Sequence, residues 1–204
     1  MHSVNNNDAF DYPESWEETC MWDGELSVHF GYASDGWVLM SLLTTAYLGH
    51  VVVHCSDAYD PFWDLVDWLE KIAKDDLPAS FIIDEEGMTK KLIASAYVGF
   101  SSFSDMEFRV VENSWNSDTE KWEDSRQFLC RCTRVQLVHE FALRLKTWLR
   151  NDYDKSHWNR SIQEDDPENP FGDLNNLNVN RILRMIRKKI RMEKNASCAA
   201  YPED

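Results

Sequence analysis

The chain has 204 residues, of which 43% are hydrophobic and 13% aromatic, a composition sufficient for the core of one ordinary domain. Acidic residues outnumber basic ones by 36 to 21, and the net charge of −15 opposes binding to nucleic acid or to anionic membranes. No apolar run reaches the roughly 18–20 residues that a membrane span needs. Residues 1–11 have no basic start and no apolar stretch, so we expect no signal peptide and predict a soluble, cytoplasmic protein.

The first predicted strands lie in the N-terminal third. Turn dipeptides at Asp23-Gly24 and Asp35-Gly36 bracket a strand from Glu25 to Tyr32. The run Trp37 to Thr44 is almost entirely apolar, which predicts a strand covered on both sides. From Tyr47 to Cys55 apolar and polar residues alternate, which predicts a strand with one buried face.

A well-marked helix follows these strands. Asp60 is placed to cap its N-terminus, and Pro61 suits the first helical position. The apolar residues then recur at the spacing of a buried helical face. They are Phe62, Leu65, Val66, Leu69, Ile72 and Ala73.

The remaining two thirds predict further strands and then two more helices. The expected strands are 79–84, 90–98, 106–112 and 126–132, with a turn at 85–87 and a polar loop over 113–124. Residues 134–150 have the pattern of an amphipathic helix, 151–173 of a loop, and 174–194 of a basic amphipathic helix. The order predicts an α+β fold, an antiparallel sheet of about six to seven strands packed by two amphipathic helices, with the basic helix at the C-terminus.

Charge is distributed unevenly along the chain. Residues 1–133 contain 25 acidic and 8 basic side chains, whereas residues 134–204 contain 11 acidic and 13 basic ones. We therefore expect an acidic α+β domain over 1–150, followed over 151–204 by a loop and the basic helix.

Acidic side chains gather around the first helix and the hairpin after it. Carboxylates at a helix C-terminus oppose the helix dipole, and adjacent carboxylates at a turn repel one another. The pattern fits either a solvated face or an electronegative docking surface for a basic protein. The candidate docking residues are Asp64, Asp67, Glu70, Asp75, Asp76, Asp84, Glu85 and Glu86.

The basic helix also has more than one interpretation. It can fold back onto the acidic body, or dock on a second copy to form a homodimer. Direct nucleic-acid binding is disfavoured, because the acidic body opposes approach and no aromatic residues are interleaved with these charges. The candidate contact residues are Arg181, Arg184, Arg187, Lys188 and Arg191.

The sequence contains no recognisable enzyme motif, such as a glycine-rich phosphate loop, a nucleophile elbow or a zinc-binding histidine pair. His50 and His54 share a strand face, but roughly 13 Å separates their side chains, too far for one metal. Cys130 and Cys132 lie beside Phe128 and are expected in the core. We therefore predict no catalytic residue, no metal and no cofactor. An enzyme whose site is assembled from distant residues, such as His50, His54 and nearby carboxylates, is the alternative.

Several segments together resemble a family group. They are Trp68-Leu69-Glu70, Phe81, Ile83-Asp84-Glu85-Glu86-Gly87, Phe108-Arg109-Val110, and the helix with Leu137-Val138 and Phe141. Over about residues 20–150 the chain is similar to small bacterial α+β proteins of the immunity-protein type encoded beside polymorphic toxins. The resemblance implies an acidic, non-enzymatic protein that neutralises a partner by covering its active surface. The tail after Asn151 departs from that pattern.

These observations predict an interaction protein of a bacterium or phage that binds and inhibits a basic protein, such as a toxin, a nuclease or a defence complex. Electrostatic steering would raise the association rate, and a few buried aromatic residues would supply most of the affinity. A structural component that self-associates through its basic helix is a second alternative, beside the enzyme.

Overall fold

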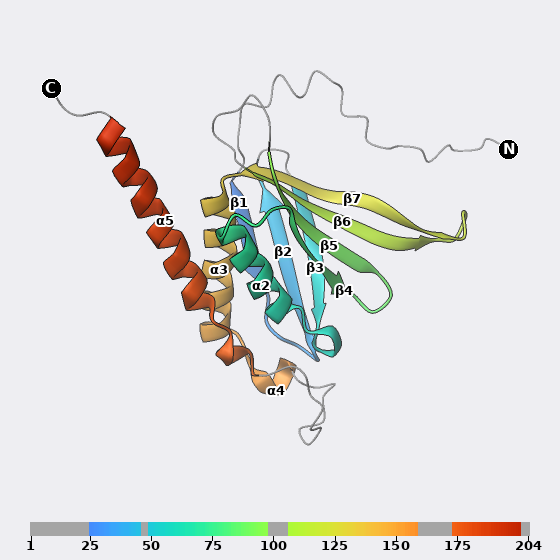
Figure 1. Cartoon of the computed structure of the whole chain (residues 1–204). Helices are drawn as coiled ribbons and strands as arrows, with labels where there is room; N and C mark the ends of the chain where they lie inside the picture. The colour runs from blue at the N-terminus through green and yellow to red at the C-terminus, as the bar shows by residue number, and fades with distance from the viewer. Residues whose placement is uncertain (1–24, 46–48, 98–105, 159–172, 201–204) are drawn as a thin grey trace.

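The computed structural model describes residues 25–45, 49–97, 106–158 and 173–200, with side chains as far as residue 192. Figure 1 shows strands and helices arranged in the α+β order that the sequence predicts. The predicted strand residues Tyr47 and Val98, and most of the predicted loop 151–173, lie outside the described residues. In chain order the elements are β1 (Leu26–Phe30), β2 (Trp37–Thr44), β3 (Gly49–Ser56), η1 (Asp57–Tyr59), α2 (Phe62–Ala73), β4 (Ala79–Asp84), β5 (Thr89–Ala96), β6 (Met106–Asn116), β7 (Lys121–Cys132), α3 (Arg134–Asn151), α4 (Lys155–Trp158), η2 (Leu174–Asn176) and α5 (Val179–Ala200).

The described strands form two antiparallel sheets, with the orders β1-β2-β3 and β4-β5-β6-β7. The α+β class is confirmed, but the prediction of a single sheet of six to seven strands is wrong. The sheets separate between β3 and β4, which are not joined as neighbouring strands. There the backbone N–H of His54 on β3 donates instead to the Glu85 carboxylate from the β4–β5 turn, at 2.6 Å.

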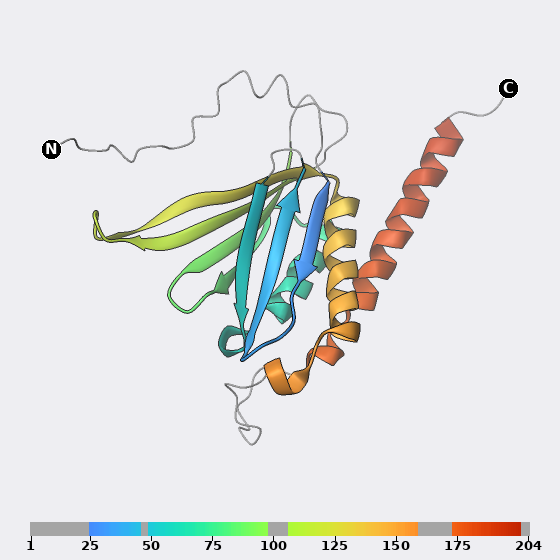
Figure 2. The same ribbon diagram turned by 180° about the vertical axis from the view of Figure 1, so that it is seen from behind.

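The first sheet is buried on one face only. Helices α2 and α3 cover that face, and Figure 2 shows the opposite face of β1–β3 with no helix in front of it. The alternation predicted for β3 is confirmed, because Val51, Val53 and Cys55 are buried and His50 and His54 are exposed. The prediction that β2 is covered on both sides is wrong. Its Leu39 and Leu43 side chains are 46% and 42% exposed, since antiparallel sheets need cover on only one face.

One aromatic core joins the two sheets and the helices. Trp68 of α2 lies with its ring centroid 5.3 to 5.7 Å from those of Phe81, Phe108 and Phe141, which belong to β4, β6 and α3. Its indole N–H donates to the Ala79 carbonyl at 3.0 Å. Because one side chain contacts three other elements, α2 cannot shift without disturbing the packing of all of them.

Local signals define how the helices begin. The Asp60 carboxylate accepts the Phe62 N–H at 2.9 Å, as predicted for a capping residue, although α2 begins at Phe62 and Pro61 stands just before it. Thr133 and Gln136 form a reciprocal capping box at the start of α3. The residues predicted for the buried face of α2 are buried except Ala73, which is only partly so.

The segment predicted as a polar loop, residues 113–124, is instead the end of a long hairpin. After a register shift between Val110 and Val111, strands β6 and β7 remain paired as far as Asn116 and Lys121. Figure 1 shows this hairpin extending beyond the other strands. Residues 121–127 of β7 are all exposed, so the ribbon has no buried face and lacks the apolar alternation by which strands are recognised.

Helix α5 forms an outer layer on α3 and α2 (Figure 1). Its apolar stripe is buried as predicted at Val179, Ile182, Leu183 and Ile186, but Ile190 is 40% exposed. The stripe loses its cover there because the C-terminal end of α5 stands away from the body in both views (Figures 1 and 2). None of the helices in the described part of the chain is long and apolar enough to cross a membrane.

Candidate protein-binding surfaces

The first candidate surface is the exposed flank of α2. Asp64 and Asp67 lie one turn apart on this flank, both exposed, and neither forms an ion pair with another described residue. They line an open depression of about 410 Å³ together with Lys71, Ser80, Lys91 and others. Two lysines therefore belong to the same surface. Asp76, after the helix, is exposed as well.

Two of the predicted docking residues are paired within the chain. Glu70 lies 2.6 Å from Lys74 and 2.8 Å from Arg181 of α5. The hydrogen bond from Lys74, followed by the charge of Arg181, lowers the pKa of Glu70 below its ordinary value. Asp75 forms an ion pair with Arg134 of α3 at 2.8 Å. These carboxylates connect the helices of the protein itself, which leaves less of their charge available to another molecule.

The β4–β5 turn corrects the expectation that Asp84, Glu85 and Glu86 form one exposed acidic tip. The Glu85 side chain is only 2% exposed and lies 2.5 Å from the Lys90 ammonium group, which is itself 7% exposed. Glu86 accepts the Ser56 hydroxyl at 2.7 Å, and Asp84 accepts the Glu86 N–H at 2.8 Å. Mutual repulsion is avoided because Glu85 turns inward to a lysine, and it is not a surface residue.

The basic residues of α5 differ in their surroundings. Arg181 reaches the acidic body through Glu70, so the start of the helix packs within the chain, one of the two arrangements that the sequence left open. Arg184 and Arg187 line an open hollow of about 400 Å³ with Lys146 of α3. Lys188 and Arg191 are exposed. Beyond its first turn, this helix therefore presents most of its positive charge to solvent.

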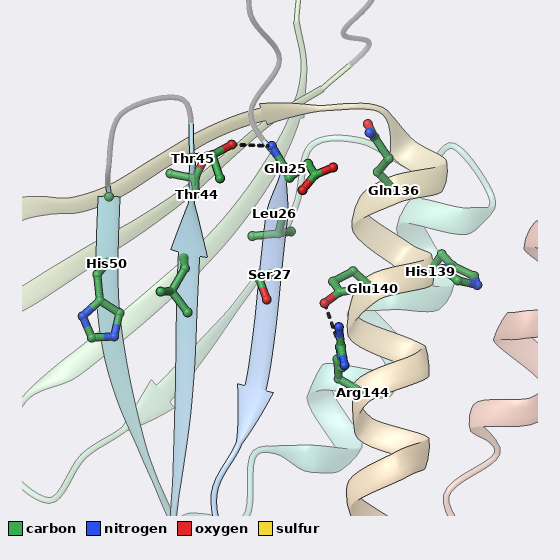
Figure 3. A pocket seen from close by; sticks show the side chains of 12 residues that line it. Glu25, Leu26, Ser27, Thr44, Thr45, His50, Gln136, His139, Glu140 and Arg144 are labelled. Carbon is green, nitrogen blue, oxygen red and sulfur yellow. Dashed lines mark hydrogen bonds and ion pairs between the residues drawn. The ribbon is translucent and has the colours of Figure 1, made fainter.

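A larger pocket of about 540 Å³ lies between the first sheet and α3 (Figure 3). Its lining includes Glu25, His50, His139, Glu140 and Arg144. The Glu140 carboxylate accepts Arg144 Nε at 2.8 Å and the Val28 N–H at 3.2 Å, so it is occupied in covering the free edge of β1. In Figure 3 His139 points away from this pair, and His50 stands on the far strand. These side chains do not converge on a common point.

Among the described residues we find neither a reactive cysteine nor a metal-binding cluster. Burial raises the pKa of the Cys55 thiol, with Glu85 and Asp60 adding to the rise, so this cysteine stays protonated. Cys130 and Cys132 are buried, as expected for core residues. No three histidine, cysteine, aspartate or glutamate side chains in the described ranges gather closely enough to hold a metal ion.

Sequence reasoning missed two exposed tryptophans at the end of the β6–β7 hairpin. Trp115 and Trp122 face each other across the strands, and each is 53% exposed. Their ring centroids lie 5.9 Å apart in an edge-to-face arrangement. The available signal was the presence of two tryptophans in an otherwise polar segment that the composition alone assigned to a loop.

Comparison with protein-family models, with curated proteins and with solved structures found no match.

Proposed function

We propose that the protein is a non-enzymatic inhibitor that binds a basic protein partner through the acidic surface of α2. The observation that carries this proposal is the pair Asp64 and Asp67, exposed side by side without an ion pair to any described residue. We call these two residues the α2 acidic surface.

The charge distribution supports a basic partner. The acidic excess lies wholly in residues 1–133, and the ion pairs from Arg134 and Arg181 neutralise Asp75 and Glu70. Asp64 and Asp67 share their depression with Lys71 and Lys91 but form no ion pair with a described residue. Over a Debye length of about 8 Å at physiological salt, such a surface steers cationic proteins into contact. A toxin or nuclease that binds phosphate with a cationic site would be blocked by the Asp64 and Asp67 carboxylates seated on that site.

The test compares two variants with the same change in net charge. Asp64→Asn/Asp67→Asn alters the α2 acidic surface, whereas Glu25→Gln/Asp154→Asn alters exposed carboxylates elsewhere. The tagged protein is used to capture partners from its native host, and the captured protein is purified and recombined with each variant. We expect a stoichiometric complex with one basic protein and loss of that protein's activity.

We expect the two variants to differ in their affinity for the partner. The α2 variant should bind the purified partner about three- to tenfold more weakly, mainly through slower association, and with a reduced salt dependence. The control variant should bind as the unaltered protein does. Equal binding by both variants would show that the α2 acidic surface is not the contact site. A complex that leaves the partner's activity intact would refute inhibition.

Self-association is a second candidate function, supported by the exposed end of α5. Ile190 and Met192 are 40% and 63% exposed beside the cationic residues of this helix, and a second acidic body could cover them. Sedimentation of the purified protein over a wide concentration range distinguishes the two functions. A constant monomer mass would leave α5 without a role in dimerisation.

A further inference from the structure

The β6–β7 hairpin presents aromatic surface where folding does not require it. Trp115 and Trp122 stand at its distal end, in the part of the ribbon that extends beyond the other strands (Figure 1). About half of each side chain is in water, although tryptophan is among the residues most enriched at binding hot spots. The pair contacts each other but lies far along the strands from the core residues Phe108 and Phe128.

Side-chain hydrogen bonds hold the end of the hairpin in shape. Asn116 accepts the Asp118 N–H at 2.9 Å, and its amide donates to Glu123 at 2.9 Å. The Thr119 hydroxyl donates to the other Glu123 oxygen at 2.6 Å. These two hydrogen bonds lower the pKa of Glu123 below its ordinary value, so its carboxylate is ionised at neutral pH. An arm ordered in advance loses little conformational entropy when it binds.

The end of the hairpin carries more negative than positive charge. Asp118, Glu120, Glu123 and Asp124 lie in the segment 118–124, and Lys121 is the basic residue among them. The face of an indole ring attracts cations, and surrounding carboxylates strengthen that preference. Such a contact already occurs in this protein, because the Arg131 guanidinium of β7 lies 4.4 Å from the centre of the ring of Tyr97, just after β5.

We propose that this hairpin is a second binding arm, which receives an arginine or lysine side chain of a basic protein on the Trp115–Trp122 pair. The inference rests on the proposed function and identifies where its affinity arises. The α2 acidic surface steers the partner, while the two indoles lose their remaining exposure in the complex. Anchoring aromatic residues, rather than peripheral charges, supply most of the affinity of protein interfaces.

A purely structural role for the pair leads to a different expectation. Aromatic residues facing each other across two strands stabilise a hairpin by themselves. In that case the indoles would not respond to a cationic ligand, and substitution would affect only the folding of the ribbon. The experiment must therefore observe the two indoles directly in the folded chain.

The probe is a short synthetic arginine–glycine peptide, with a citrulline–glycine peptide of the same length as the uncharged control. Two-dimensional NMR of the ¹⁵N-labelled full chain resolves the indole N–H signals, and Trp115→Phe and Trp122→Phe assign the two of interest. We expect the arginine peptide to shift these two signals and the citrulline peptide to leave them in place. Asp118→Asn/Glu120→Gln should weaken the response, and Trp115→Ala should reduce affinity about two- to fivefold.

Equal responses to the two peptides, shifts confined to other tryptophans, or no shift would overturn the inference. If Trp115→Ala unfolds the hairpin, Trp115→Phe keeps an aromatic ring with a weaker attraction for cations, and it should still bind less tightly. The peptide titration does not require the captured partner, and capture provides a second test. Capture that depends on Asp64 and Asp67 but not on the tryptophans would reject this arm and retain the proposed function.

Discussion

Asp60 shows how one residue can serve structure at a cost in stability. Its carboxylate accepts the Phe62 N–H at the start of α2, but it is buried at 5% exposure beside η1. Burial is the main cause that raises its pKa from 3.8 to about 6, and the Phe62 N–H opposes that rise. Because the folded state holds the proton more tightly than the unfolded state, the group favours folding at low pH. That contribution is lost as the pH rises through about 6.

Asp60→Asn should remove this pH dependence. The amide oxygen can still accept the Phe62 N–H, while the buried negative charge disappears. We expect the free energy of unfolding at about pH 8 to rise by about 1–2 kcal/mol, and its decline between about pH 4 and pH 6 to flatten. Urea denaturation across this range measures both. Asp67→Asn on the exposed flank of the same helix is the control, and it should retain the pH dependence that Asp60 causes. An unchanged slope in Asp60→Asn would contradict this account.

At the scale of elements, the β4–β5 turn joins the two sheets through side chains. Glu85 bonds the edge of β3 at the His54 N–H and pairs with Lys90 on β5. Glu112 of β6 lies 3.5 Å from the same lysine. A cation and a carboxylate buried together are expensive to separate, because removing one leaves the other without its counter-charge.

Glu85→Gln should therefore lower the free energy of unfolding by about 2–4 kcal/mol. Glu112 remains near Lys90 in this variant, so the lysine keeps part of its counter-charge. A double-mutant cycle with Lys90→Met should show strong coupling between the two positions. Thermal unfolding followed by circular dichroism measures each variant. Asp84→Asn at the same turn is the matched control and should change stability by less than about 0.5 kcal/mol. Additive effects of Glu85→Gln and Lys90→Met would show that the Glu85–Lys90 ion pair does not stabilise the fold.

At the scale of the whole molecule, the basic helix belongs to the acidic body rather than to a separate unit. Ile182 of α5 is fully buried, and Arg181 beside it pairs with Glu70. The predicted division at residue 150 therefore marks a change of charge, while the core continues across it. Leu174, Leu177 and Val179 extend that core beyond the division.

Paired substitutions along α5 test this continuity. Ile182→Ala should lower the free energy of unfolding by about 2–4 kcal/mol, since it leaves a cavity in the shared core. Ile190→Ala, at a position 40% exposed, should cost less than about 1 kcal/mol. Chemical denaturation should give one cooperative transition for both variants. Similar small effects at the two positions would mean that α5 does not stabilise the body.

The apolar pattern of the sequence predicts most of the helices and strands and much of the core. Periodic apolar residues identified α2, α3 and α5 and the buried face of β3, because burial repeats at the spacing of the element that carries it. Which carboxylates remain available to a partner depends on tertiary contacts, which the local pattern does not record. Glu85 and Asp84 are neighbours with equal charge, yet one is buried against Lys90 and the other is not. The exposed ribbon with Trp115 and Trp122 was also hidden, because local pattern records burial and a strand without a buried face leaves no such record.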